Sequence, residues 1–210
     1  MADMNAITQA LISGDMNQVT HLVQKAVDEN VTPKSILNEG LIKGMDIVGE
    51  RMQEGDMFIP EVLMSAKVMS AAVTILKPLL GEGESALSGK VVIGTVKGDM
   101  HDIGKNLVTM MLESVGFEIT DLGVDVPPEQ FVQAVKDHQP QIVGLSALLT
   151  TTMPMMQATV DALTESDLRD HIKVIIGGAP VTQKFADEIG ADGYAPDAGS
   201  ASKLAKQLAA

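Results

Sequence analysis

The sequence predicts an α/β protein in which a helical bundle precedes a doubly wound parallel sheet of five strands. Over residues 1–82 apolar side chains recur at helical spacing, whereas over 90–210 short apolar runs alternate with helical segments. The segment between them, 83–89, is polar and glycine-rich, which is typical of a linker. We therefore expect two domains, 1–82 and 90–210, joined by that linker.

Four or five helices account for the first domain. Apolar residues share one face over 7–12, and they follow the i, i+3, i+4, i+7 rule over 19–27. Thr32-Pro33 is a helix-start pair, and Ile59-Pro60-Glu61 opens the last helix. Because the turns between them are short, the helices are expected to form a small antiparallel bundle.

The second domain reads as alternating strands and helices. The predicted strands are 90–96, 117–122, 141–146, 172–176 and a weak fifth at 192–195, and the predicted helices are 104–115, 128–138, 153–165, 181–189 and 198–209. Such alternation implies parallel strands with helices on both faces. Five strands fit the flavodoxin-like, Rossmann-like order 2-1-3-4-5.

Composition removes several function classes. The net charge is −13 and only 2% of residues are aromatic, so a nucleic-acid partner is not expected. The absence of cysteine excludes a thiol nucleophile, a disulfide framework and a protein-held iron–sulfur cluster. No leader pattern and no run of about 20 apolar residues is evident, which predicts a cytoplasmic protein without a membrane segment.

Unusual residues follow three of the predicted strands. Asp99 and His101 follow the first strand, and Gly104 opens the next helix. Ser146 and Leu148 follow the third strand together with the hydroxyl run Thr150, Thr151 and Thr152, and Gly177-Gly178 ends the fourth. In the order 2-1-3-4-5 these strand ends surround one crevice at the switch point. A carboxylate beside a histidine fixes the imidazole as a metal ligand, because it accepts one ring N–H and leaves the other nitrogen free.

Alternatives remain open at this point. His101 also suits a solvated loop, and Gly177-Gly178 suits an ordinary turn. A phosphate loop is disfavoured because five residues separate Gly98 from Gly104-Lys105 and Asn106 replaces the hydroxyl. A receiver-type acidic pocket gives His101 no role. A closed zinc site is disfavoured because His21, His138 and His171 lie in helical or pre-strand positions.

The combined spacing resembles a known family. Asp99-x-His101-x-x-Gly104, then 41 residues, Ser146-x-Leu148, then 28 residues, Gly177-Gly178 resembles the B12-binding signature of corrinoid proteins. The segment 95–106 is similar to the matching part of cobalamin-dependent methionine synthase. The helical half, with Phe58-Ile59-Pro60-Glu61 before its last helix, resembles the cap domain of that family. The resemblance covers essentially the whole chain.

The resemblance implies a cobalamin cofactor bound base-off and His-on. His101 would be the lower axial ligand to cobalt, Asp99 would hydrogen-bond its other nitrogen, and Thr152 would stand where methionine synthase has a serine. Ser146 would bond the displaced base, and Leu148, Gly177 and Gly178 would shape the slot for the nucleotide tail. The remaining residues expected at the cofactor are Met100, Asp102, Ile103, Gly104 and Thr150.

The same resemblance assigns the helical domain to the upper face of the cofactor. Met57, Phe58, Val62 and Met69 would shield the reactive methyl side. Ordinary core packing is the competing interpretation of these methionines, since Met fills irregular interiors. A cap of this kind must move aside for each partner, and the linker is where a hinge would lie.

The implied function is a corrinoid methyl carrier, a subunit rather than a complete enzyme. Cobalt(I) would accept a methyl group from a substrate-specific methyltransferase acting on a methylamine, methanol, a methoxy-aromatic or a quaternary amine. A second methyltransferase would pass it to tetrahydrofolate or coenzyme M, and a reductive activation protein would restore the cofactor. The alternatives are a cobalamin-sensing regulator, for which no DNA-binding segment is visible, and the small subunit of a B12-dependent mutase, which needs no methyl-shielding cap.

Overall fold

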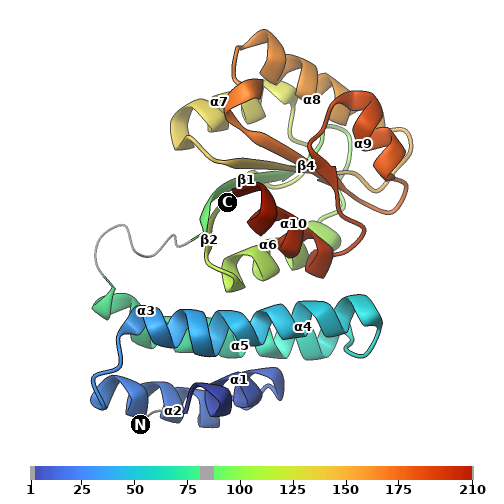
Figure 1. Ribbon diagram of the computed structural model, residues 1–210. Coiled ribbons are helices and arrows are strands. Elements are labelled where there is room, and N and C mark those ends of the chain that lie inside the picture. Colours follow the sequence, from blue (N-terminus) through green and yellow to red (C-terminus); the bar gives the residue numbers. More distant parts are fainter. Residues whose placement is uncertain (1–2, 81–87, 210) are drawn as a thin grey trace. The chain divides into compact units, whose positions relative to one another are not determined.

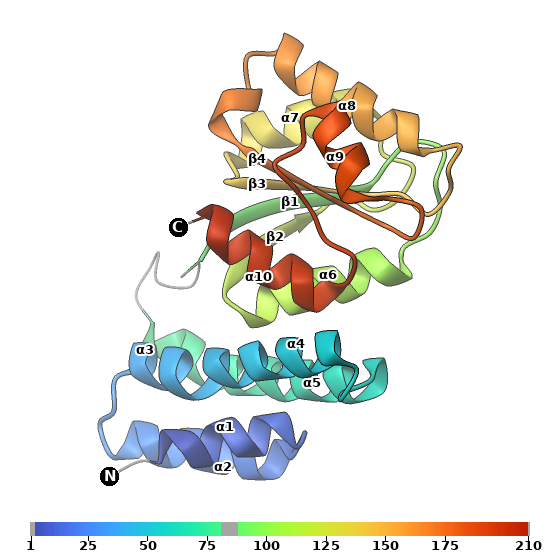
Figure 2. The same ribbon diagram turned by 45° about the vertical axis from the view of Figure 1, so that its right-hand side comes forward.

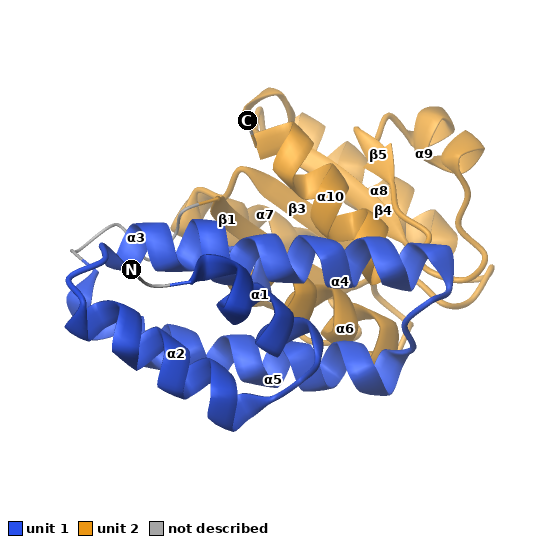
Figure 3. Cartoon of the chain, turned by 60° about the horizontal axis from the view of Figure 1, so that its bottom comes forward, with its two compact units in different colours: residues 1–87, 114–116 blue, residues 88–113, 117–210 orange. Residues whose placement is uncertain are grey.

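The computed structural model describes residues 3–80 and 88–209, and the chain divides into two compact units (Figure 3). Unit 1 comprises residues 1–87 and 114–116, and unit 2 comprises 88–113 and 117–210. Most of the predicted linker, 83–87, lies outside the described residues. Its last residue, Gly89, already belongs to the first strand.

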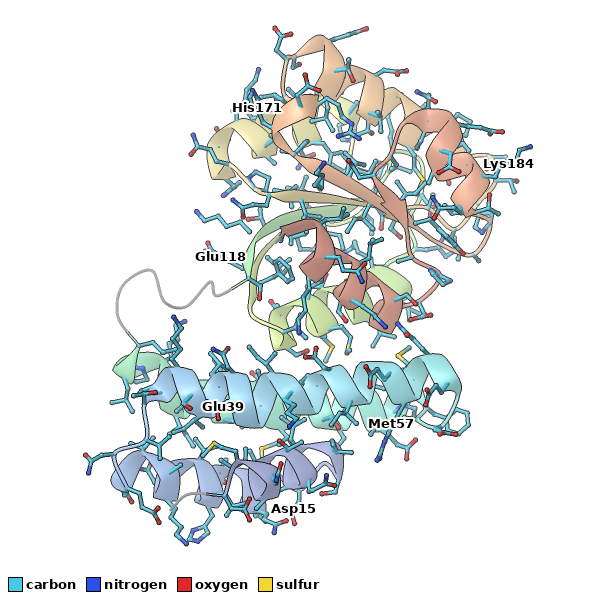
Figure 4. The ribbon with its side chains drawn as sticks, viewed as in Figure 1. Asp15, Glu39, Met57, Glu118, His171 and Lys184 are labelled. Atoms are coloured by element: carbon cyan, nitrogen blue, oxygen red, sulfur yellow. The ribbon has the colours of Figure 1, made fainter. Side chains whose placement is uncertain are left out.

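Unit 1 is helical, as predicted. Its elements are α1 (Met4–Ile12), α2 (Met16–Asp28), α3 (Pro33–Ser35), the π-helix η1 (Ile36–Ile42), α4 (Lys43–Glu54), α5 (Ile59–Leu76) and the 3₁₀-helix η2 (Lys77–Leu79). Polar side chains close the exposed N–H groups at the helix starts. Asp15, labelled in Figure 4, accepts from the Gln18 amide at 2.9 Å before α2. At α5 the Glu61 carboxylate reaches back to the Phe58 amide at 2.8 Å.

The π-helix η1 differs from the regular helix expected after Pro33. Gly40 faces α1 so closely that a Cβ there would lie 3.1 Å from Ile7 Cγ2. The buried Thr8 hydroxyl donates to the Gly40 carbonyl at 2.8 Å, so this carbonyl has a partner outside its own helix. Apolar periodicity does not report such a contact, because the spacing of apolar residues is helical in either case.

The helical stretch Ile59–Leu79 qualifies the expectation of no membrane-length segment. Its 21 residues are long and apolar enough to cross a membrane by length and composition alone. The central helix of a bundle meets the same criterion. Since α5 packs along α2 and α4, and Val62, Ala72 and Leu76 are fully buried, we assign this stretch to the bundle.

Unit 2 has the predicted five-stranded parallel sheet in the order β2-β1-β3-β4-β5. Its elements are β1 (Gly89–Thr95), α6 (Ile103–Ser114), β2 (Phe117–Asp121), α7 (Pro128–His138), β3 (Ile142–Ser146), α8 (Met153–Glu165), η3 (Arg169–His171), β4 (Lys173–Gly177), α9 (Gln183–Ile189), β5 (Gly193–Tyr194) and α10 (Ala198–Ala209). Helices α7, α8 and α9 cover one face of the sheet and α6 and α10 the other (Figures 1 and 2). The doubly wound fold class is confirmed. Helix α9 starts two residues later than expected, because the Thr182 hydroxyl accepts from the Phe185 amide at 3.2 Å and caps it there.

The register of the sheet places three sequence motifs in one row. Thr95 of β1 pairs with Ser146 of β3, and Ser146 pairs with Gly177 of β4. Parallel strands end at the same edge, so the loops after these residues leave the sheet side by side (Figure 2). The predicted convergence of the three motifs at one edge is therefore present in the fold.

Candidate functional site

A tight turn after β1 leaves the Asp99 side chain buried and the His101 side chain half-exposed. The Asp99 amide donates to the Val96 carbonyl at 3.1 Å, and Gly98 has φ +83° at the third turn position, where a type II turn needs glycine. The buried Thr95 hydroxyl donates a hydrogen bond to the His101 carbonyl at 2.9 Å. As a result Asp99 is fully buried while the His101 side chain is 50% exposed.

The buried Asp99 carboxylate accepts hydrogen bonds on both oxygens. Oδ1 receives the His101 ring Nδ1 at 2.7 Å and the His101 amide at 3.1 Å. Oδ2 receives the Leu148 amide at 2.7 Å, the Leu149 amide at 3.2 Å and the Thr152 hydroxyl at 2.7 Å. One carboxylate thus joins the loop after β1 to the loop after β3.

These contacts hold Asp99 as an anion. Burial alone would raise the pKa of the Asp99 carboxyl, but hydrogen bonds from Thr152, His101 and the Leu148 amide outweigh it and move this pKa well below its ordinary value. An ionised carboxylate only accepts, so we assign the ring proton of neutral His101 to Nδ1. Its Nε2 then carries a lone pair, and no described residue bonds it.

Exposed apolar residues lie on or next to both loops that meet at Asp99. Met100 and Ile103 flank the histidine in sequence, and Leu148 and Leu149 come from the loop after β3; their exposed fractions range from 41% to 84%. In the described part of unit 2 these four are the only large hydrophobic residues with such exposure. Exposed apolar residues concentrated on two adjacent loops are typical of a site that binds a partner or a mostly apolar ligand.

Glycine occupies the three predicted site positions 104, 177 and 178 for different physical reasons. A Cβ on Gly178 would lie 1.8 Å from the Ala147 carbonyl oxygen, and one on Gly177 would lie 2.9 Å from the Ala195 carbonyl oxygen. Both positions are therefore closed by the protein's own backbone. At Gly104 a Cβ would meet nothing within 4 Å. No neighbouring atom of the described chain requires glycine at 104, so its bare backbone leaves room for a ligand.

The other predicted residues are placed as follows. Ser146 is half-buried at the end of β3, and Thr150 is exposed in the following loop. Asp102 is exposed and accepts from the Asn106 side chain at 3.1 Å. Of the four residues expected to shield the upper face, Phe58 is 69% exposed whereas Met57, Val62 and Met69 are buried. Their roles at a cofactor stay predictions.

The rival sites receive no support from the geometry. Lys105 is buried and its ammonium donates to Asp121 and Asn106, so it does not face a phosphate. His171 lies in η3 before β4, at the amino end of the sheet (Figure 4). Over residues 3–80 and 88–209 no group of three or more His, Asp or Glu side chains is arranged to hold a metal ion.

Sequence reasoning missed part of the site. The Leu148 and Leu149 amides bind Asp99 through backbone atoms, and a side-chain pattern does not report backbone donors. Asp125, whose carboxylate accepts from the Gly98 amide at 2.7 Å, was also missed. The sequence shows only an aspartate in the connection after the second strand. Aspartate is common in such connections because it favours turns, so its presence there does not indicate a functional role.

Comparisons with known proteins identify relatives over the whole chain. Two family models described as B12 binding domains match residues 89–202 and 4–77. The dimethylamine corrinoid protein of Methanosarcina barkeri is 44% identical over 208 residues, covering 99% of this chain and 97% of the relative. A cobalamin-binding protein of Desulfitobacterium hafniense has a crystal structure that matches with a TM-score of 0.88 and 38% identity over 99% of each chain. The methanol:cobalamin methyltransferase complex MtaBC of Methanosarcina barkeri contains a chain that matches with a TM-score of 0.84 and 33% identity, covering 98% of this chain and 79% of that one.

The glycine geometry predicts opposite outcomes for two alanine variants. Gly178→Ala must place a methyl group against the Ala147 carbonyl at φ +132°, so we expect it to destabilise the cofactor-free protein by at least about 2 kcal/mol. Gly104→Ala enters open space at a helix start and should change stability by no more than about 0.5 kcal/mol. Denaturant unfolding of the two variants checks this. Equal losses of stability would contradict it.

The ionised Asp99 predicts a pH-dependent stability. Its folded pKa lies below the ordinary 3.8, so its contribution is fully present above that value and is lost as the pH falls toward the folded pKa. Asp99→Asn, whose amide N–H₂ would face hydrogen-bond donors, should unfold at a clearly lower temperature than the native protein near neutral pH. The difference should shrink below about pH 4.

Thermal unfolding of the cofactor-free proteins from neutral to acidic pH measures this difference. Asp102→Asn, in the same loop but exposed, serves as the control and should stay close to the native protein throughout. A gap between Asp99→Asn and the native protein that is constant across the acid range would show that the charge of Asp99 does not stabilise the fold.

Proposed function

Since the chain belongs to the corrinoid proteins, the family with B12-binding domains, we propose that it carries methyl groups on a cobalamin seated against His101. The observation that supports this most directly is the arrangement at Asp99. A buried carboxylate fixes the imidazole through Nδ1, no described residue bonds Nε2, and exposed apolar residues lie on or next to both loops that meet at this carboxylate. That arrangement suits the lower face of a corrin ring with the metal at its centre.

The residues present fit the cofactor. Met100, Ile103, Leu148 and Leu149 offer apolar contact to a flat macrocycle, and Gly104 leaves space beside them. We propose the base-off, His-on form, in which His101 Nε2 replaces the nucleotide base as axial ligand. Ser146, Gly177 and Gly178 would border the slot for the displaced nucleotide. When bound, cobalamin supplies the cobalt centre that accepts and releases the methyl group.

The chain itself contributes control of one proton. Asp99 holds hydrogen on Nδ1 of His101, which keeps the lone pair on Nε2 and raises its basicity as a ligand. Thr152 has a single hydroxyl proton and two acceptors within reach, Asp99 at 2.7 Å and the Leu149 carbonyl at 2.9 Å. By turning from one to the other it adjusts how strongly Asp99 binds the imidazole.

Partner enzymes are required because the chain offers no substrate site in its described residues beyond the one at His101. The chain resembles one component of a methanol:cobalamin methyltransferase complex. We propose a substrate-specific methyltransferase as methyl source, a second methyltransferase that passes the group to tetrahydrofolate or coenzyme M, and a reductive activation protein. We also propose that the carrier and these partners act in the cytoplasm.

We further propose a methylamine, with dimethylamine first, as the methyl source. The dimethylamine corrinoid protein of Methanosarcina barkeri is 44% identical along essentially the full chain. Identity to the matching chain of the methanol complex is 33%. The higher identity along the full chain supports the amine system.

Removing the axial imidazole tests cofactor binding. His101→Ala should fold normally, since its side chain is half-exposed, and should lose the absorption spectrum of a nitrogen-ligated corrinoid after reconstitution with cobinamide, which has no nucleotide base to take the place of the imidazole. His171→Ala, on η3, is the matched control and should keep that spectrum. An unchanged spectrum in His101→Ala would reject His101 as the ligand.

Donor choice tests the carrier function. Reduced, cobalamin-loaded protein should consume dimethylamine in the presence of a dimethylamine-specific methyltransferase at least about tenfold faster than methanol in the presence of a methanol-specific one. Substrate loss and the accompanying absorbance change are the measurements, with free cobalamin as control. Failure with every donor would reject the carrier function and leave cobalamin binding or sensing.

A further inference from the structure

The connection between β2 and α7 runs along the end of β1. The Leu122 amide donates to Ile93 at 2.8 Å, the Thr95 amide donates to Gly123 at 3.0 Å, and the Val126 amide donates to Thr95 at 3.0 Å. The connection therefore continues the sheet beyond the last paired residue of β2. It reaches the turn that presents Asp99 from the side opposite β3, because β1 lies between β2 and β3.

Asp125, which lies in this connection, makes two hydrogen bonds to that turn. Its carboxylate Oδ1 accepts from the Gly98 amide at 2.7 Å, and its own amide donates to the Asp99 carbonyl at 3.0 Å. Because the Gly98 N–H and the Asp99 carbonyl belong to the peptide groups before and after the Gly98–Asp99 peptide, one residue holds the turn on both sides of that peptide. Within the turn itself the Gly98 N–H has no acceptor, because the turn's hydrogen bond uses the Asp99 amide.

The backbone of Asp125 is held in an uncommon conformation for this purpose. Its φ is +54°, in the left-handed region, where a residue other than glycine costs about 1 kcal/mol. Aspartate and asparagine tolerate this region better than other residues with side chains. Such strain persists where the surrounding contacts over-determine it. Here two hydrogen bonds of the same residue end on the turn that carries the Asp99 carboxylate.

We propose that Asp125 is a positioning residue for the axial imidazole. It fixes the peptide groups on the two sides of the Gly98–Asp99 peptide, these fix the Asp99 carboxylate, and the carboxylate fixes the ring of His101. The last of these contacts, between the carboxylate and the ring, rests on the proposed function, because only a bound cobalamin gives the ring orientation a consequence. The contacts before it concern the cofactor-free chain and stand by themselves.

Three variants separate the acceptor of Asp125 from its backbone conformation. Asp125→Gly keeps the left-handed conformation and removes the carboxylate, whereas Asp125→Asn keeps both the conformation and an oxygen acceptor. Asp167→Gly is the matched control. Asp167 is also an exposed aspartate at φ +55°, and no described residue hydrogen-bonds its side chain.

The first readout uses the cofactor-free protein. Hydrogen exchange of the Gly98 amide, followed by NMR, should be about two- to tenfold faster in Asp125→Gly than in the native protein, as expected for loss of one exposed hydrogen bond. Asp125→Asn should restore the rate to within about twofold. Asp167→Gly should leave the Gly98 rate unchanged.

The second readout uses the protein loaded with cobinamide, a corrinoid without the nucleotide base, so that only the protein supplies a nitrogen ligand. Asp125→Gly should raise the dissociation constant for cobinamide about two- to tenfold and reduce the nitrogen-ligated fraction in the absorption spectrum, while Asp125→Asn and Asp167→Gly should resemble the native protein. Unchanged Gly98 exchange in Asp125→Gly, or failure of Asp125→Asn to restore it, would overturn the proposal. Faster exchange with an unchanged spectrum would overturn the link to the ligand. If the native protein itself lacks a nitrogen-ligated spectrum, the proposed function fails instead.

Discussion

The buried anion of Asp99 is the constraint on which the site depends. A carboxylate removed from water costs several kcal/mol unless donors replace the lost hydration. Here the donors are the two N–H groups of His101, the amides of Leu148 and Leu149, and the hydroxyl of Thr152. Only a fold that brings the loops after β1 and β3 together supplies them all. Neighbouring parallel strands do so, because their carboxyl ends share one edge.

The result is a ligand site assembled before any cofactor arrives. The groups that hold the histidine loop are buried: Asp99 and Thr95 are fully buried, and the backbone at Gly178 lies against that of Ala147. The apolar residues nearest to His101 in the chain are exposed, with Ile103 84% exposed. These buried contacts fix the ligand atom in advance, so less ordering is needed when a large cofactor binds.

Sequence reasoning reached the strand order and the Asp99–His101 pair because both leave a trace in side-chain patterns. Alternating apolar runs report parallel strands, and the strand ends then place Ser146 and Gly177 near the histidine loop. The same patterns are silent about backbone groups. Nothing in the side chains of Leu148 and Leu149 indicates that their amides bind a carboxylate, and nothing in the period around Gly40 indicates a π-helix. Glycines were the residues whose role the sequence indicated least, since a Cβ on Gly178 would clash with the protein's own backbone whereas a Cβ on Gly104 would meet no atom.

Thr152 shows how a departure from the family pattern can still serve the same contact. Methionine synthase resembles this chain with a serine at that position, and the extra methyl group of threonine has to be accommodated. A Cβ placed on Gly98 would lie 3.6 Å from Thr152 Cγ2, so the Thr152 methyl group lies beside the turn that presents Asp99. A β-branched side chain also has fewer rotamers than serine, which keeps its hydroxyl oxygen within hydrogen-bond reach of the carboxylate.

The turn is thus held from one side by the Thr152 hydroxyl on Asp99 and from the other by Asp125 on Gly98. The orientation of the imidazole follows from contacts on both sides of a short turn rather than from the histidine itself.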